Sequence, residues 1–216
     1  MWDLDNSISD FDKFLLDTNL IGAKTLEELE EQSKKLSFVN INNILLKEEK
    51  IDFSYEGLKD LHKRIFYNIY SWAGKDRYEL KLEGGFKKVD TSFVIGHDIP
   101  KESKKIFLNP LLEYNKENVD IFLKDFSLLY ANLNILHPFR EGNGRTIRVF
   151  LNQLAKELGY ALDLNKIPRD KLIEACIEAN IWYSFLPLEN AIRQFAIENI
   201  SQLNNNFKQT TQKSKI

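Results

Sequence analysis

The sequence has little cysteine, histidine and proline, and almost no excess of either charge. Its 216 residues include one cysteine, three histidines and five prolines, with 30 lysines and arginines against 32 acids. Cys176 alone excludes an internal disulfide and any site built from several cysteines, and so few histidines disfavour a histidine-rich metal site. Because no basic surplus is available to neutralise phosphates, we expect no direct binding of nucleic acid.

Long apolar segments are also missing. No apolar run approaches the ~20 residues of a membrane span, and residues 1–5 do not resemble the start of a secretory signal. With 43% hydrophobic residues the chain can still bury a sizeable core. We therefore expect a cytoplasmic, globular protein with no membrane contact. It should form a single domain over residues 1–200, with N-terminal helices in 1–50, a core in about 51–200 and a polar, flexible tail at 201–216.

Helical periodicity dominates what the sequence does contain. Apolar residues recur at steps of three and four over residues 54–72, 119–136 and 142–158, so each segment should bury one face of a helix. Thr25 and Glu28 have the spacing of a capping box, which opens another helix through about residue 36. The expected inward residues are Leu58, Leu61, Ile65, Ile69, Trp72, Phe122, Phe126, Leu129, Leu133, Leu136, Ile147, Phe150, Leu151, Leu154 and Leu158. Further helices are expected at residues 101–114, 169–179 and 188–199.

One segment breaks the helical pattern. Over Tyr78–Val94, polar and apolar residues alternate on either side of Gly84 and Gly85, which favours a short β-hairpin that turns at the glycines. An isolated hairpin is marginally stable, so it should lie on the helical body or be mobile. The expected fold class is all-α with one hairpin.

The stretch that carries the most chemistry runs His137-Pro138-Phe139-Arg140-Glu141-Gly142-Asn143-Gly144-Arg145-Thr146-Ile147-Arg148. Pro138 disfavours helical backbone at His137, so the preceding helix should end there. Gly142 and Gly144 let the chain curl around Asn143 where the next helix begins. Such a turn presents backbone N–H groups at a helix N-terminus, which is a site for anions.

Charged side chains surround this expected anion site. Arg145 and Arg148 are three residues apart and lie on one side of the new helix. Glu141 is placed to hold Mg²⁺ that bridges phosphate oxygens, and His137 is of the residue type most often used to accept a proton near neutral pH. Together they predict a nucleotide-dependent transferase, with Phe139 as the core anchor of the loop.

Each of these residues has an ordinary interpretation when taken alone. A histidine before proline usually ends a helix, a Gly-Asn-Gly sequence is usually a turn, and charged residues are usually solvated. Their combination within one short stretch makes the ordinary interpretation the weaker one.

The segment His137–Arg145 resembles the signature of the Fic family, His-x-Phe-x-(Asp/Glu)-Gly-Asn-(Gly/Lys)-Arg, at every fixed position. Arg148 matches the second arginine that follows this signature. Tyr70–Arg77 resembles the family's Tyr-x-Trp-Ala-Gly-x-x-Arg, and Gly22–Leu36 resembles the N-terminal helices of many members. The resemblance covers roughly residues 20–200.

The resemblance implies a protein adenylyltransferase (AMPylase), which transfers AMP from ATP to a Ser, Thr or Tyr hydroxyl of a target protein and releases pyrophosphate. It implies that His137 deprotonates the hydroxyl and that Glu141 binds Mg²⁺. The implied nucleotide ligands are Gly142, Asn143 and Gly144 at the α-phosphate, Arg145 at the β-phosphate and Arg148 at the γ-phosphate. The hairpin Tyr78–Val94 would be a flap along which the target binds as an added strand.

Two sequence features indicate which branch of the family the chain resembles and how its activity would be inhibited. Gly144 stands where the Doc-like branch, which transfers phosphate, has lysine, and this favours AMP transfer. Inhibitory helices of the family follow the pattern (Ser/Thr)-x-x-x-Glu-(Gly/Asn); Glu198 and Asn199 supply its ending, but Gln194 replaces the Ser or Thr. We therefore expect a toxin-like protein controlled by a separate small antitoxin, whose glutamate would bind Arg148.

Other functions stay open at this point. A Doc-like protein phosphotransferase is the alternative enzyme, and phosphocholine transfer is a further one. A non-catalytic module that binds peptides at the hairpin is the alternative from another class of protein.

Overall fold

The computed structural model describes residues 10–82, 87–88, 91–108 and 118–197. The chain divides into two compact units. The first holds the chain up to Lys50 together with Lys59–Lys75, and the second holds Ile51–Leu58 and the chain from Asp76 onward. The predicted domain boundaries stay predictions, and the predicted polar tail lies outside the described residues.

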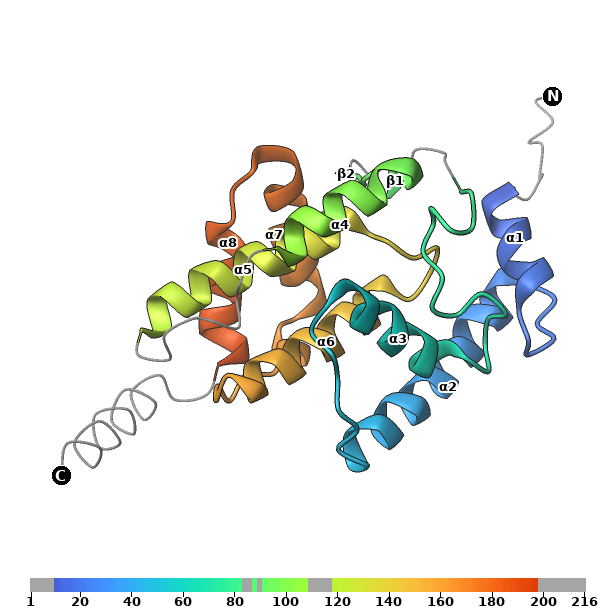
Figure 1. Cartoon of the computed structure of the whole chain (residues 1–216), viewed down its shortest axis with the longest axis horizontal. Helices are drawn as coiled ribbons and strands as arrows, with labels where there is room; N and C mark the ends of the chain where they lie inside the picture. The colour runs from blue at the N-terminus through green and yellow to red at the C-terminus, as the bar shows by residue number, and fades with distance from the viewer. Residues whose placement is uncertain (1–9, 83–86, 89–90, 109–117, 198–216) are drawn as a thin grey trace. The chain divides into compact units, whose positions relative to one another are not determined.

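The described secondary structure is helical apart from two very short strands (Figure 1), so the predicted all-α class is confirmed. None of the described helices combines the length and hydropathy that crossing a bilayer requires. The elements are α1 (Asp10–Thr18), α2 (Leu26–Leu46), α3 (Tyr55–Phe66), β1 (Lys87–Lys88), β2 (Thr91–Ser92), η1 (Gly96–Asp98), α4 (Ile99–Phe107), α5 (Val119–Leu136), α6 (Asn143–Glu157), η3 (Leu164–Lys166), α7 (Arg169–Trp182), α8 (Leu186–Ala191) and η4 (Ile192–Ala196).

Helix α2 begins where the capping box predicts and ends later than expected. The Thr25 hydroxyl accepts a hydrogen bond from the N–H of Glu28 at 3.2 Å, as an N-cap residue does. The buried face of the helix carries Ser33, Ser37 and Asn40 among its apolar residues. Polar residues on the buried face interrupt the apolar periodicity from which a helix is predicted. This explains why the sequence predicted that the helix ends near residue 36.

Helix α3 ends earlier than predicted, at Phe66 instead of near Trp72. The backbone after it pairs with the end of α1: the N–H of Leu20 donates to the carbonyl of Ile69 at 2.8 Å, and the N–H of Ser71 donates to the carbonyl of Thr18 at 3.1 Å. These tertiary hydrogen bonds replace the helical ones that the periodicity favoured.

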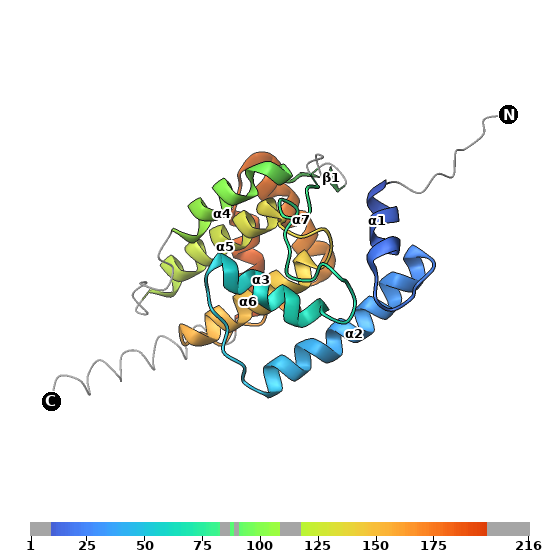
Figure 2. The ribbon, with the colours of Figure 1, turned by 45° about the vertical axis from the view of Figure 1, so that its right-hand side comes forward.

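Helix α5 is the central helix of the second unit and contacts α4, α6, α7 and α8. Figures 1 and 2 both show α4 and α5 side by side. All the predicted inward residues are buried, and none is more than 6% exposed. The predicted bounds of α5 match the observed ones, with the side chain of Asn118 capping its first turn.

The hairpin prediction is partly wrong. Strands β1 and β2 pair antiparallel, with Lys87 opposite Ser92 and Lys88 opposite Thr91, so both strands lie beyond the two glycines where the turn was expected. Tyr78 starts no strand, because the preceding Asp76 organises tight turns: its carboxylate accepts from the N–H of Glu79, and its carbonyl accepts from the N–H of Leu80. Gly84 and Gly85 themselves lie outside the described residues.

Candidate active site

The two central helices of the second unit are joined by a short loop, residues 137–142, which we call the histidine loop. His137 follows the last residue of α5 in left-handed backbone, at φ 43° and ψ 57°. Gly142 precedes α6 at φ 85°, a conformation that costs glycine little and other residues more. The first helical hydrogen bond of α6 runs from the N–H of Thr146 to the carbonyl of Gly142 at 3.0 Å. The N–H groups of residues 143–145 therefore have no acceptor within the helix itself, as at every helix N-terminus.

The histidine loop is fastened by Arg77, a fully buried residue. Its Nε donates to the carbonyl of His137 at 2.9 Å, and one Nη donates to the carbonyls of Val94 at 2.6 Å and Leu136 at 3.2 Å. The N–H of Arg77 also donates to the carbonyl of Pro138 at 2.7 Å. Burial lowers the pKa of this guanidinium to about 10. Arg77 thus ties the end of α5 to the segment that follows β2.

The imidazole of His137 is held from two sides. The ring stacks on Phe93, with centroids 3.8 Å apart and planes inclined by 24°. Its Nδ1 lies 3.3 Å from the carbonyl oxygen of Asn134, an arrangement that fits a proton on Nδ1. In this tautomer Nε2 is the nitrogen with the lone pair, so it is the atom able to accept a proton.

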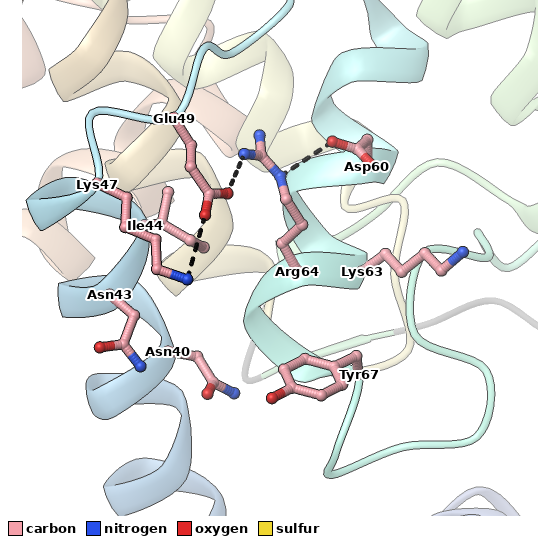
Figure 3. Close-up of a pocket in the computed structure, with 9 residues that line it drawn as sticks. All are labelled: Asn40, Asn43, Ile44, Lys47, Glu49, Asp60, Lys63, Arg64 and Tyr67. Atoms are coloured by element: carbon pink, nitrogen blue, oxygen red, sulfur yellow. Dashed lines mark hydrogen bonds and ion pairs between the residues drawn. The ribbon is translucent and has the colours of Figure 1, made fainter.

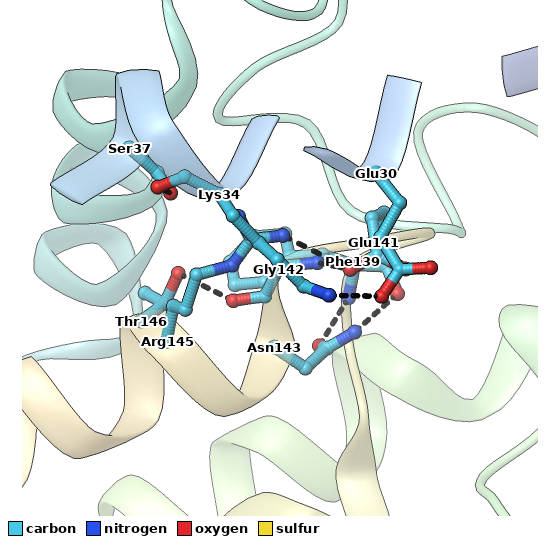
Figure 4. A network of polar contacts seen from close by, with 9 residues as sticks. All are labelled: Glu30, Lys34, Ser37, Phe139, Glu141, Gly142, Asn143, Arg145 and Thr146. Carbon is cyan, nitrogen blue, oxygen red and sulfur yellow. Dashed lines mark hydrogen bonds and ion pairs between the residues drawn. The ribbon is translucent and has the colours of Figure 1, made fainter. Parts of the chain in front are cut away.

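Asn143 holds the loop closed through its side chain (Figure 4). Its Oδ1 accepts from the N–H of Phe139 at 2.9 Å, and its Nδ2 donates to the carbonyl of Phe139 at 2.7 Å. Phe139 is fully buried, as predicted for a core anchor. The side chain of Asn143 therefore closes the loop, and its predicted contact with a phosphate stays a prediction.

Glu141 and Arg145 lie together at the start of α6 (Figure 4). The carboxylate Oε1 of Glu141 accepts from the N–H of Gly142 at 2.9 Å and lies 3.2 Å from an Nη of Arg145. Both side chains keep access to solvent, with 40% of Glu141 and 22% of Arg145 exposed. The N–H of Gly142, one of the predicted phosphate ligands, therefore faces this carboxylate in the structure.

Arg148 has a different environment from Arg145. Its Nε donates to Oδ1 of Asn165 at 3.2 Å, and its guanidinium interacts electrostatically with the phenol of Tyr130. A Cβ atom added to Gly144 would lie 3.3 Å from one Nη of Arg148, so this guanidinium lies over the first turn of α6. Among the described residues, no ion pair involves Arg148.

The single carboxylate Glu141 is the one candidate for the predicted metal. Among the described residues, no group of three or more His, Cys, Asp or Glu side chains is arranged to hold a metal ion. Mg²⁺ in nucleotide sites is held by one or two carboxylates together with phosphate oxygens and water. A half-exposed glutamate beside unused helix N–H groups fits that requirement.

Sequence reasoning missed two contributors to this site. Arg77 was noted only as the end of a family-like stretch, and Asn165 was not noted at all. The hydrogen-bond partners of Arg77 are backbone carbonyls, which every residue has, so no sequence pattern indicates them. Asn165 lies in η3, distant in sequence from Arg148, and only the fold brings them together.

A second polar pocket lies in the first unit (Figure 3). Arg64 is placed between two acids, with Nη1 3.0 Å from Glu49 and Nε 3.0 Å from Asp60. These carboxylates neutralise the charge of the arginine, and Glu49 also lies 3.9 Å from Nζ of Lys47. Its lining residues are Asn40, Asn43, Ile44, Lys47, Glu49, Asp60, Lys63, Arg64 and Tyr67.

Comparisons with known proteins agree with this geometry. Residues 52–155 match the Fic/DOC family model. The chain is 31% identical over 163 residues to protein adenylyltransferase VbhT of Bartonella schoenbuchensis, with 74% of this chain and 33% of the relative covered. It is 30% identical over 164 residues to Probable protein adenylyltransferase y4lH of Sinorhizobium fredii, with 74% and 80% covered.

A solved structure shows the same fold. The N-terminal Fic domain of a VirB-translocated Bep effector protein from Bartonella quintana, with bound ADP, superimposes with a TM-score of 0.72 at 22% identity and covers 94% of this chain and 96% of that one. The chain belongs to the Fic/DOC family. It spans only 33% of the length of VbhT and most of the length of y4lH.

Proposed function

We propose that this chain is a protein adenylyltransferase that transfers AMP from ATP to a Ser, Thr or Tyr hydroxyl of a target protein. The observation that carries the proposal is the histidine loop, in which an oriented imidazole at the end of α5 lies one short turn from the N-terminus of α6 and its two arginines. The curated relatives VbhT and y4lH, which are named as adenylyltransferases, support it.

In this reaction His137 acts as the general base. Its Nε2 takes the proton of the target hydroxyl as the hydroxyl oxygen forms a bond to the α-phosphorus. The bond from that phosphorus to the bridging oxygen breaks, and the electron pair leaves with pyrophosphate. The stack on Phe93 and the contact of Nδ1 with the Asn134 carbonyl keep the ring in one orientation, so the base is positioned before the target arrives.

The start of α6 binds the triphosphate. The backbone N–H groups of Asn143 and Gly144 face the α-phosphate, where charge develops as the target oxygen attacks. Arg145 binds the β-phosphate and Arg148 the γ-phosphate, with Arg145 exchanging its contact to Glu141 for phosphate oxygens. Glu141 binds the Mg²⁺ that accompanies ATP, and this ion would neutralise phosphate charge.

Gly144 supports AMP transfer over transfer of the γ-phosphate. Its Cβ position lies 3.3 Å from the Arg148 guanidinium, so a longer side chain there would displace the arginine from the helix start. A lysine at this position, as in the Doc-like branch, would therefore require the guanidinium of Arg148 to move. Here the glycine leaves Arg148 over the first turn.

The target protein would bind along the hairpin. Strands β1 and β2 are joined to the histidine loop through Phe93 and Val94, which follow β2 directly. A segment added to this hairpin as a strand would bring its hydroxyl toward the imidazole. The separate antitoxin remains part of this proposal, and Glu198 and Asn199, the nearest internal match to an inhibitory motif, lie outside the described residues.

The test is labelling of a cell lysate with ATP that carries the label at the α-phosphate or at the γ-phosphate. AMP transfer predicts protein label only from the α-position, and it predicts that His137→Ala removes the label while ATP binding is largely kept. The exposed His97 provides a matched control, because His97→Ala removes an imidazole outside the histidine loop and should keep the labelling.

Other outcomes would decide against the proposal. Label from the γ-position alone would indicate a Doc-like phosphotransferase. Equal behaviour of the wild type and His137→Ala, with no label from either position, would indicate a peptide-binding module without catalysis.

A further inference from the structure

The second arginine of the site has two neutral side chains beside it. Oδ1 of Asn165 accepts from Nε of Arg148 at 3.2 Å, and the phenol of Tyr130 interacts electrostatically with the same guanidinium. Tyr130 is buried at 3% exposure, whereas Asn165 is exposed.

The orientation of Asn165 is fixed by a hydrogen-bond network. Its Nδ2 and its backbone N–H both donate to Oδ1 of Asp163, at 2.9 and 3.0 Å. The same oxygen accepts from Nδ2 of Asn152 at 3.1 Å. Because the Asn165 amide nitrogen is directed to a carboxylate, its oxygen is the atom turned to Arg148. Asp163 thus orients Asn165, and among the described residues its carboxylate forms no ion pair with Arg148.

A neutral partner has a different consequence from an acidic one. A carboxylate beside a guanidinium cancels its charge and must be displaced before a phosphate binds. Asn165 and Tyr130 are neutral, so they lie beside Arg148 without forming an ion pair that a phosphate would have to displace. Arg145, in contrast, already lies against the carboxylate of Glu141. The two arginines of the site therefore differ in the charge that each can offer to an incoming anion.

We propose that Asn165 and Tyr130 are positioning residues that hold the Arg148 guanidinium over Gly144 with its charge uncompensated, and so set the preference of this site for a nucleoside triphosphate over a diphosphate. This inference rests on the proposed function, because it assigns Arg148 to the terminal phosphate. Neither residue touches the reacting atoms, and both act through Arg148.

The test compares the dissociation constants of ATP and ADP, measured by calorimetry on the full chain with Mg²⁺ present. Asn165→Asp introduces a carboxylate of nearly the same shape beside Arg148 and also removes the Nδ2 donor to Asp163. We expect it to weaken ATP binding about tenfold, on the order of one close charge pair at a solvated site, while the affinity for ADP changes little. Asn165→Ala and Tyr130→Phe should lower the ratio of ATP to ADP affinity by a smaller factor, because they loosen the guanidinium without opposing its charge.

Matched controls separate this effect from general damage. Asn190→Asp adds the same charge at an exposed position of α8 and should leave the affinity ratio unchanged. Thermal unfolding of each variant checks that the fold is kept, and the exposure of Asn165 favours that result. If Asn165→Asp keeps the wild-type ratio of ATP to ADP affinity, the inference is overturned and the proposed function stands. If the wild type binds neither nucleotide, the proposed function fails and the inference with it.

Discussion

At the scale of single residues, Arg77 shows what a sequence can and cannot indicate about a site. The histidine, glutamate and arginines of the motif were predictable because their chemistry is concentrated in one short stretch. The role of Arg77 was not predictable, because its partners are carbonyl groups, which every residue has. Only the fold decides which of them meet a guanidinium.

Replacement of this buried arginine should be costly. Arg77→Lys keeps the charge but offers one nitrogen in place of a planar fork, so at least one of the carbonyls of Val94, Leu136 and His137 loses its donor. We expect a loss of about 2 kcal/mol in the free energy of unfolding, the cost of a buried acceptor left without a hydrogen bond. Urea titration followed by circular dichroism measures it.

The same change at the exposed Arg169 is the reference for this measurement. Arg169→Lys should lie within about 0.5 kcal/mol of the wild type. An Arg77→Lys protein as stable as the Arg169→Lys protein would contradict the role assigned to the buried guanidinium.

At the scale of elements, apolar periodicity predicted the helices whose buried faces are apolar. It did not predict the helical segments whose buried faces include polar residues. The bounds of α5 follow from its apolar stripe and its Asn118 cap. The second half of α2 buries Ser37 and Asn40, and Asn40 donates through Nδ2 to the carbonyl of Ile65 at 2.8 Å. The hairpin was misplaced along the chain because alternation over a few residues is a weak signal, and the turns organised by Asp76 compete with it.

The start of α2 offers a test of the capping prediction. Thr25→Ala removes the oxygen that accepts from the N–H of Glu28 and should lower the free energy of unfolding by about 1 kcal/mol. Thr25→Ser restores a hydroxyl and should recover most of that loss. Denaturant midpoints of the three proteins provide the comparison, and equal midpoints for Thr25→Ala and the wild type would show that the cap contributes nothing.

At the scale of the whole molecule, the chain has one cysteine, and its thiol lies near Arg148 in the second unit. Burial raises the pKa of Cys176 to about 12, although the positive charge of Arg148 opposes this shift. Because the folded pKa exceeds the ordinary thiol value, the folded state is favoured below pH 9 and loses this contribution as the pH rises from 9 toward 12.

Cys176 should therefore report on unfolding. With a pKa near 12, about one thiol in ten thousand is ionised at pH 8, so a thiol reagent should modify the native protein far more slowly than a free cysteine peptide. Addition of urea to the unfolding midpoint should raise the labelling rate steeply. If the native protein is labelled as fast as the peptide at pH 8, the Cys176 thiol is accessible to the reagent and its pKa is not raised.

The bonds of Arg77 have a consequence for anyone who wishes to redirect the protein to a new substrate. Arg77 binds the carbonyls of both Val94, which follows the hairpin, and His137, the proposed base. A change in the backbone beyond Ser92 is therefore expected to move the imidazole as well. Segments transplanted from other proteins should therefore replace only the chain before Ser92. Grafts that extend beyond it are expected to change recognition and turnover together.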